Sequence, residues 1–334
     1  MGVSVLRHKL ARIMYKPKIL IVINDNFFGG IQLRWDYLKD KFTNIDLEVI
    51  SRQNLGTMNF KVIDNFGERI NYINQFDIVD FQTNGIMTIE ELPFCQNKVV
   101  ETIHSIERSS QITDMKIGMS DCVSLNQILP CQTIYPGVNL ERIKKGDKSA
   151  LRKKWGIPEN MVVVGRIGRL VSGKHPFDFC RVAALVKGAY YLMVNEGTKD
   201  MQTLSNFMQQ NKVTWNYIEG SPEINKDFWS IIDILLYPTE DESYCNVFFE
   251  AMFSDIPIVT YAIPVANEFG IQIRCKLGDI QELAIALQNL IDDEKLRKEL
   301  IIRGQKIRQG HNMLESIPKL ERLYRLLYEN RTIK

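Results

Sequence analysis

The sequence predicts an α/β protein with two domains, each built around a parallel β-sheet. Its 334 residues are about twice the length of a typical domain. Short β-branched apolar runs alternate with helical patterns, which is typical of βαβ units. A charged stretch with few apolar residues separates two such series at 141–154. We therefore expect an N-terminal segment at 1–17, one domain at 18–140, a second at 141–310, and a C-terminal helix at 311–334.

The first domain begins with the run KILIVI at 18–23, which is expected of a strand buried on both faces. Two glycines follow it, and a helical pattern begins at Ile31 and reaches about Lys41. Further strands of this domain are expected at 45–51, 77–82, 98–104, 121–125 and 132–135. A turn signal, Pro136-Gly137-Val138-Asn139, closes the domain.

The second domain repeats the same alternation. Strands are expected at 162–167, 190–195, 213–218, 234–237, 256–260 and 271–275. Helices are expected at 176–187, 199–210, 225–232 and 247–253, and the tail 280–328 is predicted to be helical because its leucines recur at helical spacing.

Composition excludes several classes of protein. Lys and Arg total 42 against 40 Asp and Glu, and this near balance gives no electrostatic reason to expect nucleic-acid binding. The longest uncharged apolar run, 256–267, is too short to span a membrane. Six cysteines without a C-x-x-C pair and four dispersed histidines show no zinc spacing. No secretory signal is recognisable, so we expect a cytoplasmic protein with reduced thiols.

Residues 3–18 combine apolar positions at helical spacing with five basic side chains, and no acidic residue precedes Asp25. Such a stretch suits peripheral contact with an anionic membrane surface. A short helix packed on its own domain, or a partly ordered tail, explains the pattern equally simply.

Three groups of residues are suited to binding a phosphorylated ligand. The first is Gly29-Gly30, between the first strand and the first helix. Glycines there permit close backbone approach, and the amides at the start of a helix favour an anion. A tight turn is the alternative interpretation. No G-x-G-x-x-G fingerprint or P-loop occurs, which argues against NAD binding and P-loop ATPases.

The second group lies at 165–174, where a strand ends in a loop that carries Arg169 and Lys174. Ligands of open parallel sheets bind at the carboxyl ends of the strands. There the planar Arg fork and the Lys point charge are suited to neutralising a diphosphate. Solvated surface charge is the alternative.

The third group lies at 237–252, where an acidic loop leads into a helix. Glu242 is in the loop and Glu250 about one turn into the helix, so both can face one crevice. A carboxylate there can accept hydrogen bonds from two sugar hydroxyls, and the helix N-terminal amides at 245–247 can hold an anion. The alternative is that both carboxylates are solvated or cap the helix.

Taken together, these motifs resemble the retaining glycosyltransferases of family four, which have the GT-B fold and a Glu-x7-Glu motif. The resemblance rests on VGRIGRLVSGK at 164–174 and DILLYPTEDESYCNVFFEAM at 233–252. Weaker matches are FGGI at 28–31, TIHS at 102–105 and the linker IYPGVN at 134–139. The resemblance implies two Rossmann-like domains facing a central cleft, with C-terminal helices that cross back to the first domain.

The resemblance also implies roles for individual residues. Arg169 and Lys174 would hold the diphosphate of a nucleotide-sugar, and Glu250 would bind the ribose hydroxyls. The transferred sugar and its phosphate would be bound by Glu242 and by the backbone amides of Tyr244, Cys245, Asn246 and Val247. Gly29 and Gly30 would approach the phosphate, and His104 would contact the sugar near its 6-hydroxyl. Glu242, His104, Arg169 and Lys174 would thus be the catalytic group, with no cofactor or metal.

The activity that the resemblance implies is transfer of a hexose from a UDP- or GDP-sugar to a glycan, lipid-linked or polysaccharide acceptor, with retention of configuration. Two alternatives remain at this stage: a GT-B nucleotide-sugar epimerase, and a non-catalytic nucleotide-sugar-binding partner of another transferase. The run Ser243–Asn246 departs from the family's Gly-Phe-Gly. We therefore expect additional side chains where the backbone should approach the sugar.

Overall fold

The computed structural model describes residues 15–23, 29–53, 58–143, 146–195 and 201–330. Most of the predicted amphipathic segment at 3–18 lies outside these ranges. The chain forms two compact units, the first containing the residues up to Pro136 together with those from Met313 onward, and the second Gly137–Asn312. In the described part of the chain, no helix has the length and apolar character needed to cross a membrane.

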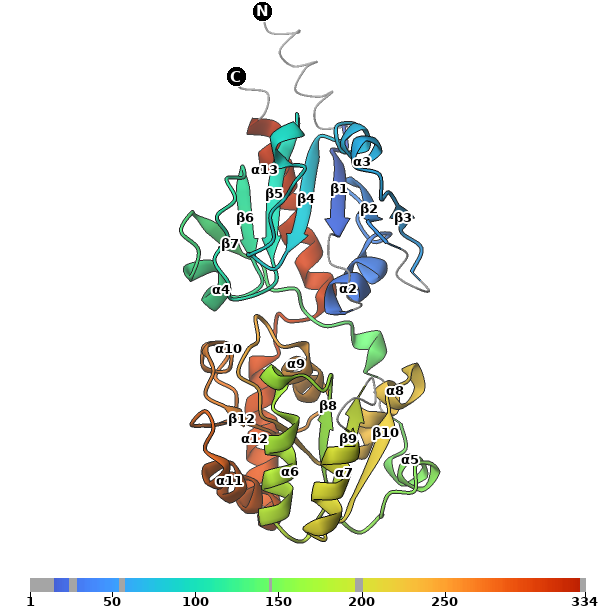
Figure 1. Ribbon diagram of the computed structural model, residues 1–334, viewed down its shortest axis with the longest axis vertical. Helices are drawn as coiled ribbons and strands as arrows, with labels where there is room; N and C mark the ends of the chain where they lie inside the picture. Colours follow the sequence, from blue (N-terminus) through green and yellow to red (C-terminus); the bar gives the residue numbers. More distant parts are fainter. Residues whose placement is uncertain (1–14, 24–28, 54–57, 144–145, 196–200, 331–334) are drawn as a thin grey trace, which may run out of the picture. The chain divides into compact units, whose positions relative to one another are not determined.

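The first unit contains a seven-stranded sheet in the order β3-β2-β1-β4-β5-β6-β7, and each neighbouring pair is parallel (Figure 1). Its strands are β1 (Lys18–Ile23), β2 (Asp46–Ser51), β3 (Lys61–Val62), β4 (Ile78–Thr83), β5 (Lys98–Ile103), β6 (Met115–Gly118) and β7 (Cys131–Thr133). Five of the six residues of β1 are buried, as its β-branched run predicts for a central strand covered on both faces.

The helices of the first unit are α2 (Gly30–Leu38), α3 (Phe66–Ile73), α4 (Asp121–Leu125) and the C-terminal α13 (Ile317–Asn330). Figure 1 shows α13 alongside the strands of this unit. The hydroxyl of Tyr324 donates to Asp80 of β4 at 2.6 Å. The carboxylate of Glu321 accepts hydrogen bonds from the backbone amides of Thr43 and Asn44, both at 2.9 Å. Buried polar contacts therefore attach the last helix to a sheet far from it in sequence.

The second unit contains a six-stranded parallel sheet in the order β10-β9-β8-β11-β12-β13. Its strands are β8 (Val162–Ile167), β9 (Ala189–Asn195), β10 (Trp215–Glu219), β11 (Ile234–Tyr237), β12 (Ile258–Tyr261) and β13 (Ile273–Cys275). All seven residues of β9 and all four of β11 are buried, so the centre of this sheet is the core of the unit.

The helices of the second unit are α5 (Lys148–Lys154), α6 (Pro176–Leu185), α7 (Met201–Gln210), α8 (Pro222–Ile231), α9 (Asn246–Phe253), α10 (Pro264–Glu268), α11 (Ile280–Asp292) and α12 (Glu294–Ile307). Side-chain caps explain where several of them begin. Asp147, Ser221 and Asp279 each accept a hydrogen bond from the backbone amide three residues later, which satisfies an amide that the helix leaves unpaired.

One expected element is wrong. The segment 121–125, expected as a strand, is helix α4, and the strand of this βα unit is β6, just before it. Both segments are short and partly apolar, and periodicity does not separate a helix from a strand at that length. The tail 280–328 is helical, as predicted, and consists mainly of α11, α12 and α13. Asp293 caps a new helix by accepting a hydrogen bond from Leu296, and a further break precedes α13.

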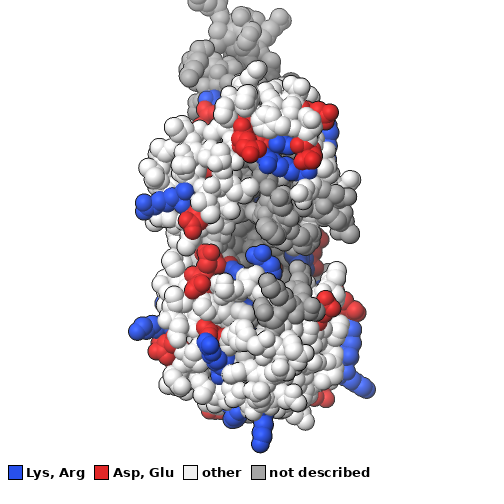
Figure 2. Space-filling view, viewed as in Figure 1, with Lys and Arg blue, Asp and Glu red and all other residues white. Residues whose placement is uncertain are grey.

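Charged side chains of both signs occur on the surface that Figure 2 displays. Lys and Arg are interspersed there with Asp and Glu, as expected for a chain whose net charge is only +2.

Candidate functional site

The two motif loops of the second unit start from neighbouring strands. β11 pairs in parallel with β8, so the loop after Ile167 and the loop after Tyr237 leave the sheet at the same edge. Gly168 begins the first loop with a φ of +134°, a conformation that glycine adopts without a steric penalty. The amide of Glu240 donates to the carbonyl of Gly173 at 3.1 Å, which joins the two loops.

Lys174 and Glu242 meet at this edge. Lys174 Nζ lies 2.7 Å from Glu242 Oε1 and also donates to the carbonyl of Asp241 at 2.8 Å. The two side chains are only 17% and 13% exposed, so solvent screens their attraction less than on an open surface. Thr239 Oγ1 donates to the carbonyl of Gly173 at 3.1 Å. The structure thus brings together a cation and a carboxylate that lie 68 residues apart in the printed sequence.

Arg169 lies on the exposed side of the same loop. Within the described ranges, no carboxylate or carbonyl pairs with its guanidinium. A planar fork of N–H donors is therefore presented to solvent close in sequence to Lys174. Such a group is suited to a bidentate contact with a phosphate.

Helix α9 begins at this edge with its amides directed out of the helix. Cys245 precedes it in the left-handed region, at a φ of +61°. The amides of Asn246 and Val247 belong to the first turn, where the helix supplies no acceptor of its own. The N-terminal end of a helix also carries partial positive charge. These two predicted amides are therefore available to an anion.

The run 243–246 has side chains where the resembled family has glycines, and the side chain of Cys245 is not exposed. This side chain is buried, and burial, followed by the nearby Glu242, raises the pKa of its thiol well above the ordinary range. Tyr244 is buried as well: its ring stacks on Phe249 at 4.6 Å, and its hydroxyl lies 2.9 Å from His311 Nδ1. The thiol of Cys245 nevertheless lies beside the carboxylate of Glu242 and close to Lys174, within the loop that carries the motif.

Glu250 is half-buried in the second turn of α9. Burial raises the pKa of its carboxyl group, and the charge of Arg142 partly opposes that increase. Among the described residues, no group donates a hydrogen bond to this carboxylate. A half-buried carboxylate with unused lone pairs is suited to accept hydrogen bonds from a pair of ligand hydroxyls.

His104 follows β5 in the first unit, and its Nε2 lies 2.8 Å from Gln82 Oε1. Gln82 Oε1 also accepts from Trp35 Nε1, while Gln82 Nε2 donates to Asp80. The imidazole therefore donates through Nε2 and keeps Nδ1 as an acceptor. Burial, and then the charge of Arg34, lowers the pKa of His104 to about 3, so the ring is neutral near pH 7.

Gly29 and Gly30 mark the start of α2, as their pattern predicts, and the carbonyl of Gly29 accepts from the amide of Leu33 at 3.2 Å. The residues just before them, 24–28, lie outside the described ranges. The ligand roles of Gly29, Gly30 and His104 stay predictions.

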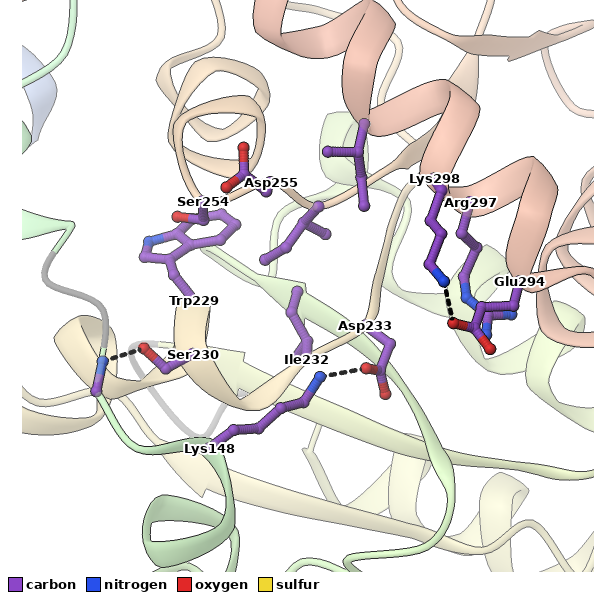
Figure 3. Close-up of a pocket in the computed structure, with 13 residues that line it drawn as sticks. Lys148, Trp229, Ser230, Ile232, Asp233, Ser254, Asp255, Glu294, Arg297 and Lys298 are labelled. Carbon is purple, nitrogen blue, oxygen red and sulfur yellow. Dashed lines mark hydrogen bonds and ion pairs between the residues drawn. The ribbon is translucent and has the colours of Figure 1, made fainter.

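A hollow of about 370 Å³ lies elsewhere in the second unit, at the amino-terminal end of β11 (Figure 3). Lys148 reaches Asp233 there, and Lys298 reaches Glu294 at 2.7 Å. Carboxylates of the same hollow thus pair with both lysines, and the third cation there, Arg297, donates to the carbonyls of Leu290 and Ile291. We therefore regard the carboxyl end of the sheet as the better candidate for an anionic ligand. No cluster of His, Cys, Asp or Glu suited to a metal ion occurs among the described residues.

Sequence reasoning missed two residues that build this site. Thr239 joins the two loops by donating to the carbonyl of Gly173. Arg166, on β8, donates to carbonyls of the first loop, among them that of Arg169. A signal for Arg166 was present: it is a charged residue inside an otherwise apolar strand.

Comparisons with known proteins find a family match within the second unit. The family described as glycosyl transferases group 1 matches residues 147–307. The matched segment, 147–307, is thus similar to a glycosyl transferases group 1 domain. This segment contains Arg169, Lys174, Glu242 and Glu250, whereas Gly29, Gly30 and His104 lie outside it.

A D-inositol 3-phosphate glycosyltransferase of Mycolicibacterium smegmatis is 25% identical over 172 residues, which are 48% of this chain. The chain spans about 40% of the length of that relative. A glycosyltransferase from Rickettsia africae has a TM-score of 0.78 at 16% identity, covering 94% of this chain and 99% of its own. HepE from Anabaena, solved with UDP-glucose, has a TM-score of 0.76 at 16% identity, covering 92% and 99%. The two parallel-sheet, Rossmann-like units thus have the fold of GT-B glycosyltransferases.

Proposed function

We propose that this protein is a retaining glycosyltransferase that transfers a hexose from a UDP- or GDP-sugar to a glycan, lipid-linked or polysaccharide acceptor. The observation that carries the proposal is the ion pair of Lys174 with Glu242 at the carboxyl edge of the sheet, inside the segment that matches glycosyl transferases group 1. Glu250 lies on α9, the helix that follows the loop of Glu242. HepE, which has the same fold, was solved with UDP-glucose, which supports a nucleotide-sugar as donor.

The chemistry of the site suits departure of a diphosphate. Cleavage of a nucleotide-sugar places negative charge on the leaving diphosphate and positive charge on the anomeric carbon. Arg169, Lys174 and the first amides of α9 are donors held in position before the reaction, so they stabilise the leaving group without reorganising. Lys174 exchanges its partner Glu242 for the diphosphate, and the released carboxylate accepts hydroxyl hydrogens of the sugar.

Retention follows if the acceptor attacks from the face that the diphosphate leaves. A phosphate oxygen then removes the proton from the acceptor hydroxyl, so the protein needs no general base. We also propose that the reaction needs no metal, because the cations and amides of the site neutralise the leaving group. Membrane contact through residues 3–18 and a cytoplasmic location remain part of the proposal.

The test is release of nucleotide from a panel of UDP- and GDP-sugars, in the presence and absence of a chelator. Slow release from one donor, insensitive to the chelator and abolished by both Glu250→Ala and Lys174→Ala, is the expected result. Glu299→Ala is a matched control, because Glu299 lies on α12 and is 61% exposed. Analysis of the product anomer by NMR then tests retention.

Other outcomes assign a different function. Binding of a nucleotide without turnover of any donor would favour a non-catalytic partner of another transferase. Conversion of the donor into an epimer would favour a nucleotide-sugar epimerase. Absence of nucleotide binding would refute the location of the donor site.

A further inference from the structure

Arg166 is fully buried beneath the loop that carries Arg169 and Lys174. Its guanidinium donates to three carbonyls of that loop: Nη1 to Gly168 at 3.3 Å, and Nη2 to Arg169 at 3.1 Å and to Lys174 at 3.2 Å. One side chain thereby holds both ends of the 168–174 segment. Thr239 and the amide of Glu240 hold the loop at Gly173, and Arg166 holds its two ends from the strand that precedes it.

The charge of Arg166 is not compensated by a carboxylate. Two other buried arginines have one: Arg69 lies 2.6 Å from Glu91, and Arg152 lies 2.6 Å from Asp233. No ion pair is formed by Arg166 with any described residue, and no described group pairs with its Nε. Burial lowers the pKa of Arg166, yet a guanidinium stays protonated in proteins. Burying an unpaired charge is costly, and an anion bound nearby would offset that cost.

The hydrogen bonds from Arg166 also orient the backbone amides of the loop. A trans peptide directs its C=O and N–H in opposite directions, and no cis bond occurs in the described chain. Because the carbonyls of Gly168 and Arg169 point toward Arg166, the amides of Arg169 and Leu170 point away from it. Neither amide donates to a described group. Adjacent amides pointing to the same side form a concavity that binds anions.

We propose that Arg166 is a positioning residue of the diphosphate site. It holds the loop so that the amides of Arg169 and Leu170, with the side chains of Arg169 and Lys174, receive the diphosphate of a nucleoside diphosphate. Its uncompensated charge adds to the positive potential that the ligand meets. This inference rests on the proposed function, because it takes the ligand to be a nucleotide-sugar or its nucleoside diphosphate product.

The experiment compares the affinities of the full chain for UDP and uridine, and for GDP and guanosine, by calorimetry. The ratio of the diphosphate affinity to the nucleoside affinity reports the diphosphate site alone. Arg166→Lys keeps the charge but loses the fork, and Arg166→Gln loses both. We expect the ratio to fall about 10-fold in Arg166→Lys and about 100-fold in Arg166→Gln, with nucleoside affinity within about threefold of wild type.

Arg152→Lys is the matched control. Arg152 is also buried and also holds carbonyls, those of Ile231, Glu159 and Met161, but it lies beside Asp233 before β11. This variant should lower the melting temperature and leave the affinity ratio unchanged.

Three results would overturn the inference. The first is an unchanged ratio in folded Arg166 variants. The second is an equal loss of diphosphate and nucleoside affinity, which indicates a merely structural role. The third is failure of both variants to fold while the Arg152 control folds. Wild type that binds no nucleoside diphosphate would refute the proposed function as well, whereas binding without turnover would refute transfer and leave the role of Arg166 intact.

Discussion

Replacing Glu250 by glutamine should weaken nucleotide binding without destabilising the fold. The carboxylate is half-buried in α9 and accepts no hydrogen bond from the described residues, so its lone pairs are available to a ligand. Hydrogen bonds to a charged group contribute about 1.5–3 kcal/mol each; glutamine loses one of the two expected from the ligand, because its NH₂ group does not accept, and keeps the other through its oxygen. A net loss of about 1.5–3 kcal/mol corresponds to an increase in Kd of about 10- to 150-fold.

The folding stability of Glu250→Gln should be equal to or higher than that of the wild type, although its nucleotide affinity is lower. Burial raises the pKa of Glu250, so the folded state holds this proton more tightly than the unfolded chain does. The free energy of unfolding of the wild type therefore falls as pH rises through the raised pKa. Glutamine carries no charge, so the variant does not lose stability by burying an ionised carboxylate. At pH 7–8 we expect the melting temperature of Glu250→Gln to equal or exceed that of the wild type.

The assay is calorimetric titration with UDP and 2′-deoxy-UDP, or with the guanosine pair if GDP binds. Removing the 2′-hydroxyl should cost the wild type affinity and should cost Glu250→Gln much less, because the two changes remove the same contact. Glu299→Gln, on the exposed face of α12, should behave as wild type. Equal Kd values for wild type and Glu250→Gln, or an undiminished penalty for 2′-deoxy-UDP in the variant, would refute the assignment to the ribose.

Three further predictions concern other parts of the molecule. Lys174→Gln should raise the Kd for UDP about 10- to 100-fold and leave the Kd for uridine unchanged, and parallel changes in both would contradict a diphosphate contact. Because the pKa of His104 is lowered to about 3, its NMR ring signals should not titrate between pH 5 and 8. The stability that this neutral ring contributes is complete above about pH 6.5 and is lost as pH falls toward 3; a ring midpoint near 6.5 would disprove this. Gly165→Ala should cost about 1–3 kcal/mol in chemical denaturation, because its Cβ would lie 2.4 Å from Ile232 Cγ2. Gly67→Ala meets only an ordinary contact at 3.5 Å and is the control, so equal unfolding midpoints would count against the clash.

Local sequence was sufficient for most of the fold. The β-branched run at 18–23 is the buried strand β1, and the run at 162–167 is the strand β8. Such runs predict strands because they bury apolar surface on both faces of a parallel sheet. The segment 121–125 was misjudged because a five-residue pattern does not distinguish one turn of helix from a short strand.

The sequence by itself determined the chemical groups of the candidate site and the loops that carry them. Lys174 and Glu242 follow strands whose periodicity is readable, and both were expected at the carboxyl end of a sheet. Only the tertiary structure decided that they form an ion pair, that the side chain of Cys245 is buried, and that Arg166 holds the loop by its carbonyls. These features depend on strand order and on contacts between residues far apart in the chain, which no local pattern encodes.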